Sequence, residues 1–231
     1  MRLDKYLALA AGLTRSQARR VVHSGRVSVA GVRQKDTGAA CQSGDEVQLD
    51  GELLILPAEH RYYMLNKPAG LITSTQDGGY GTVMSCLPDE LRDGLMPVGR
   101  LDKETTGLLL LTTDGAWSQR MRKPGVHSKV YRITLDQPCT EDMLKAWLQG
   151  VSLRGDEQPG RALAVECLNS HEVRMTVDEG RYHLVRRMCA AVGNHVKALH
   201  REQVAGICLD AALSVGSWRE LDEAEVHVVG S

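Results

Sequence analysis

The chain has 231 residues, of which 42% are hydrophobic, and its 28 Lys and Arg nearly balance 29 Asp and Glu. This length and composition predict an ordinary soluble protein with buried cores, either one large domain or a small domain beside a medium one. The six cysteines include no Cys-x-x-Cys pair, which argues against a zinc site or a disulfide framework and favours a reducing cytoplasm. No apolar run approaches the roughly twenty residues that cross a bilayer, and the N-terminus lacks a cleavage signature, so we expect neither membrane insertion nor secretion.

The near-neutral net charge hides a basic N-terminal segment. Its first 35 residues contain a single acid, Asp4, against eight basic residues: Arg2, Lys5, Arg15, Arg19, Arg20, Arg26, Arg33 and Lys35. A local excess of this kind is typical of a nucleic-acid-binding surface, but most charge runs only solvate a helix face. The residues of the segment leave both interpretations open.

Residues 1–57 have the pattern of a small module of two helices followed by hairpins. Thr14 and Gln17 form a capping box for a helix that Gly25 ends, and Arg15 and Arg19 are expected on its exposed face. The Ala-Gly pair at 30–31 separates two short strands. The Asp-Gly pair at 50–51 lies between two apolar runs, which is a strong signal for a β-hairpin.

After residues 57–61 the sequence changes to longer strands rich in Leu and Val, so we expect a second domain over residues 61–231. Its predicted strands cover residues 61–66, 107–113, 128–135, 162–168 and 172–177, and its predicted helices cover residues 114–123, 140–150 and 180–194. Neighbouring strands resemble hairpins more than strand-helix-strand crossovers. This order predicts an α+β domain with a mostly antiparallel sheet.

One stretch of this second domain, GRLDKETTGLLLLTTDG at residues 99–115, sets charged residues directly before four leucines. Leu108 to Leu111 is too short for a buried helix, but it has the length of a strand covered on both faces. We therefore expect Asp102 at the rim of the core. A carboxylate that loses water there needs a cation or it protonates, and Arg100 is a nearby candidate for a structural or catalytic pair.

Most common catalytic motifs are missing from the sequence. It contains no phosphate-binding loop, no dinucleotide-binding glycine pattern, no His-Glu-x-x-His and no Gly-x-Ser-x-Gly. His195 and His200 do not share a helical face, so we interpret them as packing or surface residues rather than metal ligands. What remains is one acid with several cations and an aromatic residue at strand ends: Asn66, Lys67, Arg100, Asp102, Lys129, Tyr131, Arg181, Arg186 and Arg187.

The stretch at 99–115 closely resembles the signature of the pseudouridine synthases that act on small-subunit ribosomal RNA. LNKPAG, KVYRITL and EGRYHLVRRMCAAVGNHV resemble the other motifs of that family in the right order, and the resemblance covers nearly the whole chain. Residues 1–57 are similar to the alpha-L RNA-binding module that precedes the catalytic domain in this group. The resemblance therefore implies an α+β enzyme with a small N-terminal RNA-binding module.

The resemblance also implies roles for single residues. Asp102 matches the catalytic aspartate, which attacks the uridine nucleotide while the N-glycosidic bond breaks, so that the detached uracil rotates and rejoins through carbon 5. Tyr131 matches the tyrosine that stacks on the base, and Arg186 matches the basic residue that pairs with the aspartate. No cofactor is implied. Leu184 stands where relatives commonly carry Gln, which puts only a secondary polar contact in doubt.

The remaining polar residues fall into two expected groups. Substrate contacts are expected from Arg100, Lys129, Asn66 and Lys67 beside Tyr131 and Arg186. Contacts to RNA are expected from Arg2, Lys5, Arg15, Arg19, Arg20, Arg26, Arg181 and Arg187. The expected partner is 16S ribosomal RNA, free or in a partly assembled small subunit, bound by a monomer in the cytoplasm.

Three alternatives remain beside this interpretation. A relative in the same family could act on 23S ribosomal RNA. A glycosidase-like hydrolase would pair Asp102 with Glu104 or Asp114, but nothing in the sequence marks the second carboxylate, which such enzymes hold about 5 to 9 Å from the first. A non-catalytic RNA-binding protein of ribosome assembly would keep the basic module and tolerate the loss of Asp102.

Overall fold

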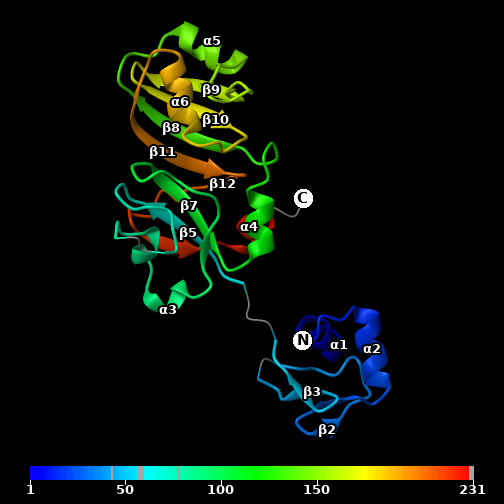
Figure 1. The fold of residues 1–231 in the computed structure, drawn as a ribbon. Helices are drawn as coiled ribbons and strands as arrows, with labels where there is room; N and C mark the ends of the chain where they lie inside the picture. The colour runs from blue at the N-terminus through cyan, green and yellow to red at the C-terminus, as the bar shows by residue number, and fades with distance from the viewer. Residues whose placement is uncertain (43, 57–59, 77–78, 229–231) are drawn as a thin grey trace. The chain divides into compact units, whose positions relative to one another are not determined.

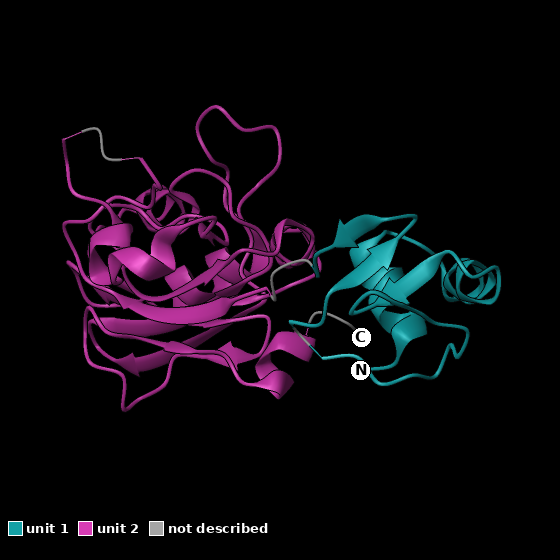
Figure 2. Cartoon of the chain, turned by 90° about the horizontal axis from the view of Figure 1, so that it is seen from below, with its two compact units in different colours: residues 1–59 teal, residues 60–231 magenta. Residues whose placement is uncertain are grey.

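The chain divides into two compact units, residues 1–59 and 60–231 (Figure 2). The computed structural model describes residues 1–42, 44–56, 60–76 and 79–228 (Figure 1). The division falls within the segment 57–61, where the composition of the sequence changes. None of the helices in the described ranges is long and apolar enough to cross a membrane.

The first unit contains two helices and a four-stranded antiparallel sheet in the order β2-β1-β3-β4. Its elements are α1 (Leu3–Ala10), α2 (Arg15–His23), β1 (Val27–Val29), β2 (Val32–Arg33), β3 (Val47–Leu49) and β4 (Glu52–Leu54). Leu3, Leu7 and Val22 are fully buried and pack with Val27 and Val47 in one core. The predicted module of helices and hairpins is thus confirmed.

Local signals at the ends of these elements are also confirmed. The Thr14 hydroxyl accepts a hydrogen bond from the Gln17 amide, and the Gln17 side chain accepts one from the Thr14 amide, as a capping box requires. Both residues of each predicted turn, 30–31 and 50–51, have positive φ angles. This backbone conformation matches the right-handed twist of a two-residue hairpin.

The second unit is built on a nine-stranded sheet. Seven strands lie in the order β13-β5-β7-β11-β8-β10-β9, while β6 pairs with β7 and β12 pairs with β11. The strands are β5 (Tyr62–Lys67), β6 (Met96–Pro97), β7 (Thr106–Thr112), β8 (Lys129–Leu135), β9 (Ala164–Asn169), β10 (Glu172–Val177), β11 (Val196–Val204), β12 (Ile207–Cys208) and β13 (Trp218–Glu220). Among the described strands only β7 and β11 pair in parallel, so the predicted mostly antiparallel sheet is confirmed.

Helices cover this sheet on both faces. They are η1 (Val83–Cys86), α3 (Asp89–Arg92), α4 (Gly115–Met121), α5 (Glu141–Gln149), α6 (Leu184–Ala191) and α7 (Glu223–His227). Trp147 of α5 and Met188 of α6 pack into the larger core cluster, and both helices lie over the same face of β8 and β10 (Figure 1). Trp117 of α4 packs into the smaller cluster.

The four leucines of β7 alternate between these two clusters. Leu109 and Leu111 belong to the larger one, whereas Leu108 and Leu110 belong to the smaller one, and all four are at most 1% exposed. The strand is therefore covered on both faces, as its continuous apolar sequence predicted.

Gly107 allows β7 and β11 to approach closely beside the end of that strand. Its φ angle is +96°, and a Cβ atom there would lie 2.3 Å from the carbonyl oxygen of Arg201. Since real Cβ contacts are not that short, only glycine fits this position. The close approach places Arg201 beside Gly107 at the start of β7.

The second unit differs from the sequence prediction in several features: the short elements β6, β12, β13, η1, α3 and α7 were not predicted, and two longer segments near the cleft also differ. The strand β11 was not predicted, because Arg201 occupies a buried position and breaks the apolar alternation. The predicted helix over 180–194 begins only at Leu184, since His183 has a left-handed backbone conformation with φ 51° and ψ 28°. Residues 180–183 instead form an extended turn before α6.

Candidate active site

Asp102 lies in the loop between β6 and β7, and buried polar groups hold this loop in place. The Thr73 hydroxyl donates to the Leu101 carbonyl at 2.8 Å and accepts from the Leu101 amide at 3.1 Å. The Lys67 ammonium donates to the carbonyls of Lys103 and Thr105 at 3.0 and 2.9 Å. The backbone on both sides of Asp102 is thus fastened to β5 and to the loop after it.

Lys67 and Asn66, both predicted to contact substrate, are buried and hydrogen-bonded within the protein. Lys67 is 0% exposed, and its third hydrogen bond goes to the Pro68 carbonyl. Burial lowers the pKa of Lys67 to about 8. The Asn66 amide donates to the Leu213 carbonyl, and neither side chain lines the cleft described below. These two residues shape the core under the site, because buried donors must satisfy backbone carbonyls there.

The Asp102 carboxylate faces two side chains from the segment around the start of α6. Its Oδ2 atom lies 3.4 Å from Nε of Arg186, and its Oδ1 atom lies 3.4 Å from Nε2 of His183. Arg186 also reaches the Thr105 hydroxyl at 3.5 Å. Both contacts of Asp102 are longer than direct hydrogen bonds, and its side chain remains 32% exposed. The carboxylate is therefore oriented by a cation yet open to a ligand.

Arg186 thus takes the place that local sequence assigned to Arg100. Arg100 lines the cleft and is exposed, and no ion pair with Asp102 is found among the described residues. The reason is tertiary, since α6 brings Arg186 to the carboxylate from a distant part of the chain. Arg100 lines the cleft beside Asp102, but it is not the ion-pair partner of Asp102 among the described residues.

His183 was not among the residues predicted for the site. Its left-handed backbone turns the ring toward Asp102, and Tyr182 stacks on it with ring centroids 3.8 Å apart and 15° between the planes. A non-glycine residue in this conformation is uncommon and marks a constrained position. The sequence signal that could have found it is the histidine directly before the Leu-Val-Arg-Arg start of α6.

A cleft of about 390 Å³ opens beside Asp102, and residues of β8, β11 and α6 line it. Tyr131 is 9% exposed, and Lys129 lies two residues before it on β8. The Lys129 ammonium donates to the His127 carbonyl at 3.1 Å, and burial, together with the charge of Arg201, lowers its pKa. The cleft thus joins one carboxylate, an aromatic ring and basic groups, the set that the sequence predicted.

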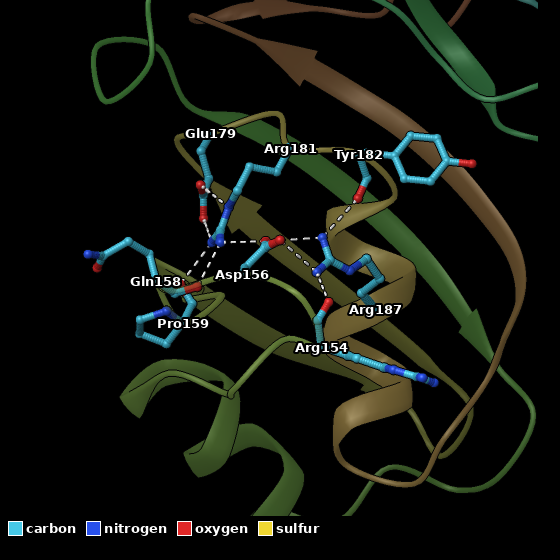
Figure 3. A network of polar contacts seen from close by, with 8 residues as sticks. All are labelled: Arg154, Asp156, Gln158, Pro159, Glu179, Arg181, Tyr182 and Arg187. Carbon is cyan, nitrogen blue, oxygen red and sulfur yellow. Dashed lines mark hydrogen bonds and ion pairs between the residues drawn. The ribbon is translucent and has the colours of Figure 1, made fainter.

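Arg181 and Arg187, both predicted to contact RNA, take part in a network of polar contacts (Figure 3). Both contact Asp156, Arg181 at 2.8 Å and Arg187 at 3.0 Å, and their hydrogen bonds lower its pKa. Arg181 also pairs with Glu179 and reaches the carbonyls of Gln158 and Pro159, and Arg187 reaches those of Arg154 and Tyr182. These contacts give both residues a structural role, and their predicted contact to RNA stays a prediction. They fasten the turn that carries His183 and the start of α6, which carries Arg186.

Three predicted RNA-binding residues of the first unit surround a buried acid instead of forming a simple solvated face. Asp4 is fully buried and lies within 3.3 Å of side-chain nitrogens of Arg2, Arg15 and Arg19. Burial alone would raise the pKa of Asp4, but hydrogen bonds from the three arginines lower it to about 2. The arginine side chains remain about half exposed, which leaves their outer edges open to a ligand.

The other basic residues of the first unit differ in their partners. Arg26 pairs with Asp50 across the hairpin. Lys5 and Arg20 are exposed and have no ion pair among the described residues. Lys5 and Arg20 are thus the predicted RNA-binding residues whose charges are least engaged within the protein.

Comparisons with known proteins agree with this geometry. Residues 61–191 match the family described as RNA pseudouridylate synthase, and residues 1–47 match the S4 domain. The chain is 41% identical over 228 residues to the ribosomal small subunit pseudouridine synthase A of Haemophilus influenzae, covering 98% of each protein. It is 41% identical to the protein of that name from Escherichia coli K12, covering 99% of this chain and all of the relative. A crystal structure of a pseudouridylate synthase matches 99% of both chains with a TM-score of 0.71 and 39% identity.

The chain therefore belongs to the RNA pseudouridylate synthase family. It is an isomerase that converts uridine in RNA to pseudouridine, and an RNA-binding S4 domain precedes its catalytic domain. The resemblance found in the sequence and the α+β fold that it implied are confirmed. The glycosidase-like and non-catalytic alternatives are not supported by this membership.

Proposed function

We propose that this enzyme converts one uridine of 16S ribosomal RNA to pseudouridine, with Asp102 as its nucleophile. The relatives named for the ribosomal small subunit align over nearly their full length, which supports a small-subunit target. The observation that carries the proposal is the Asp102–Arg186 pair at a cleft lined by Tyr131. The enzyme acts as a monomer in the cytoplasm, on free RNA or on a partly assembled small subunit.

The reaction begins when the target uridine leaves its stack and enters the cleft. A base must be extruded before an enzyme can reach its sugar-base bond, and an aromatic face then holds it. Tyr131 is nearly buried on the wall of the cleft, so its ring is available only to a group that enters from the open side. A flat uracil fits this requirement.

Asp102 then attacks the nucleotide while the C1′–N1 bond breaks, and the base leaves with the bonding electrons. After the uracil rotates, C5 forms the new bond to C1′, the carboxylate is released, C5 loses its proton and N1 gains one. The carboxylate acts as the nucleophile, and the Arg186 guanidinium lies 3.4 Å from its Oδ2 atom and balances its charge in the cleft. His183 lies 3.4 Å from the second oxygen of the carboxylate and limits the directions in which the side chain can turn.

The S4 domain and the cleft have different tasks in this proposal. Arg2, Lys5, Arg15, Arg19, Arg20 and Arg26 of the first unit contact phosphates, which position the RNA without reading its sequence. Arg100 and Lys129 contact the nucleotide at the cleft, because both line it. The base itself is recognised inside the cleft.

The experiment is a comparison of ribosomal pseudouridine maps from a strain that lacks the gene and strains that express the wild type or Asp102→Asn. A chemical label specific for pseudouridine should lose one site in 16S RNA in the deletion strain, and only the wild type should restore it. Loss of a 23S site instead would move the target to the large subunit. An unchanged map of both RNAs would contradict a ribosomal target.

A further inference from the structure

Arg201 is a buried cation that the proposed chemistry has not yet used. It lies on β11 with 3% of its surface exposed, and it lines the cleft that contains Asp102 and Tyr131. Its Nε atom donates to the Leu108 carbonyl at 2.8 Å. Its Nη2 atom is buried and has no hydrogen-bond partner among the described residues. An unpaired donor of this kind is costly, because a buried polar group that gives up water needs a replacement.

The charge of Arg201 is also unpaired. The described part of the chain offers it no carboxylate within ion-pair distance, unlike Arg132 on the neighbouring strand, which pairs with Glu202 at 2.8 Å. Lys129 is close enough that the charge of Arg201 contributes to lowering its pKa. One side of the cleft therefore carries two cations, Arg201 and Lys129, and could bind a negatively polarised group.

The depth of the site decides which part of the RNA can be that group. A phosphodiester continues into the chain in both directions, so a buried guanidinium cannot reach it unless the backbone itself is engulfed. A base is attached at one point only, and it can enter a cleft of about 390 Å³ edge first. Tyr131 pairs directly with Arg201 across β8 and β11, so a base that contacts the ring can also reach the guanidinium.

We propose that the Arg201 guanidinium donates a hydrogen bond from Nη2 to a carbonyl oxygen of the target uracil and stabilises the negative charge of the departing base. When the C1′–N1 bond breaks, its electron pair moves to N1 and spreads over the two carbonyl oxygens of the ring. Arg201 supplies the hydrogen bond and a positive charge, and no proton has to leave it in this step. A preorganised donor in a site that excludes water stabilises such charge more than water does.

The proposal rests on the proposed uridine isomerisation, and its test measures binding and chemistry separately. The substrate is 16S RNA labelled with tritium at C5 of its uridines, used free and in partly assembled particles. Tritium is released because C5 loses its hydrogen when it bonds to C1′. Single-turnover rates with excess enzyme report the chemical step. Equilibrium binding at two salt concentrations reports the RNA contacts of the same variants.

The expected result is that Arg201→Met lowers the single-turnover rate by about 100-fold or more, with RNA affinity and its salt dependence nearly unchanged. Arg201→Lys should lose less, because it keeps the charge but cannot hold the Leu108 carbonyl and the base together. Guanidinium ions added to Arg201→Ala should restore part of the rate. They should restore nothing to Asp102→Asn, which retains Arg201.

Arg132→Met is the matched control. Arg132 is next to Tyr131 on β8, but it is exposed on the other face of the sheet and pairs with Glu202. The same loss of charge there should leave the rate unchanged. A similar loss of rate in Arg132→Met would show that the global charge matters and would overturn the proposal.

Two further outcomes would overturn the proposal. An unchanged rate in a folded Arg201→Met means that the guanidinium does not act on the base. A weaker affinity with a smaller salt slope and an unchanged rate means that it binds phosphate. If Arg201→Met does not fold, the test uses the single-turnover rate of Arg201→Lys and the rescue of Arg201→Ala by guanidinium ions. If both variants fold, lose the same amount of rate and show no rescue, the proposed role of Arg201 is rejected. A wild type that forms no pseudouridine in 16S RNA contradicts the proposed function instead.

Discussion

Asp4 in the first unit and Asp102 in the second both lie against arginines, but their surroundings differ in one respect. Asp4 is fully buried, and three guanidiniums contact its two oxygens. Asp102 has one guanidinium and one imidazole, each 3.4 Å away, and about a third of its surface is open to the cleft. The oxygens of Asp4 therefore accept hydrogen bonds from protein groups on several sides, whereas those of Asp102 can still accept hydrogen bonds from a ligand.

The difference separates a structural from a chemical use of the same residue types. A carboxylate that accepts several short bonds is stabilised in its charged form and is a poor nucleophile, because its lone pairs are engaged. A carboxylate held by longer contacts can still turn its oxygens toward a substrate. Both acids lie beside an arginine, so an arginine alone does not distinguish the reactive carboxylate. The distinguishing feature is how many hydrogen bonds the carboxylate accepts from the protein.

The largest expected effect comes from removing the nucleophile. Asp102→Asn should reduce pseudouridine formation by more than about 1000-fold, because the amide cannot form the covalent bond to the sugar. RNA affinity and thermal stability should change little, since the swap is nearly isosteric and the side chain has only long contacts. Tritium release from C5 and binding by filter retention measure both. Activity within about tenfold of the wild type would contradict the nucleophile assignment.

The next effect tests whether Arg186 orients and balances that acid. Arg186→Met keeps much of the apolar stem but leaves Asp102 without its cation, so turnover at neutral pH should fall by about 100-fold. Arg186→Lys should be milder, because it keeps the charge and loses only the planar fork. Single-turnover rates check this order. Equal losses in both variants, with unchanged circular dichroism, would show that the guanidinium shape acts on the RNA instead.

A smaller effect, on stability, is expected from a substitution of Asp4. Asp4→Asn should lower the free energy of unfolding by about 2 kcal/mol, because three guanidiniums lose their shared anion while remaining half exposed. The folded pKa of Asp4, about 2, lies below its ordinary value of 3.8. The stabilisation is therefore present above pH 3.8 and is lost as the pH falls toward 2. Denaturant unfolding of the full chain at pH 7 and in acid measures it.

The pH dependence of stability should distinguish the wild type from Asp4→Asn. The stability difference between wild type and variant should narrow as the pH falls through this range, since both side chains are then uncharged. A difference that stays constant between pH 5 and pH 2 would mean that the carboxylate is not held in its charged form by Arg2, Arg15 and Arg19.

The smallest expected effect is on RNA binding. It distinguishes basic residues of the first unit that form ion pairs within the protein from those that do not. The double variant of Lys5→Ala and Arg20→Ala should weaken RNA binding by several-fold and reduce its salt slope without changing stability, because these residues have no ion pair in the described part of the chain. Arg15→Ala and Arg19→Ala together should instead lower stability, since they expose Asp4 and leave it with Arg2 as its one arginine partner. Binding at two salt concentrations and thermal unfolding distinguish the pairs. Unchanged affinity in Lys5→Ala and Arg20→Ala would return them to a purely solvating role.

Short-range patterns in the sequence were sufficient for much of the fold. The capping box at Thr14, the turn at 50–51 and the doubly covered leucines of β7 all depend on neighbours within a few residues, and all three are present. The motif around Asp102 likewise predicted a carboxylate at the rim of the core. Such features follow from local backbone geometry and from the period of burial, which the sequence displays directly.

The partners of each charge could be decided only by the tertiary structure. The residues around Asp102 offered only Arg100 as a nearby candidate, and Arg186 was indicated only by the resemblance to a known family. In the structure α6 brings Arg186 to Asp102, and the turn before α6 adds His183. Arg181 and Arg187 were predicted to contact RNA because they are basic, and in the structure both form ion pairs with Asp156 (Figure 3). An ion pair forms between any opposite charges that the packed elements bring within about 4 Å, and that distance does not depend on separation along the chain. The residue types were therefore evident from the sequence, while their engagement depended on how β7, β11 and α6 pack together.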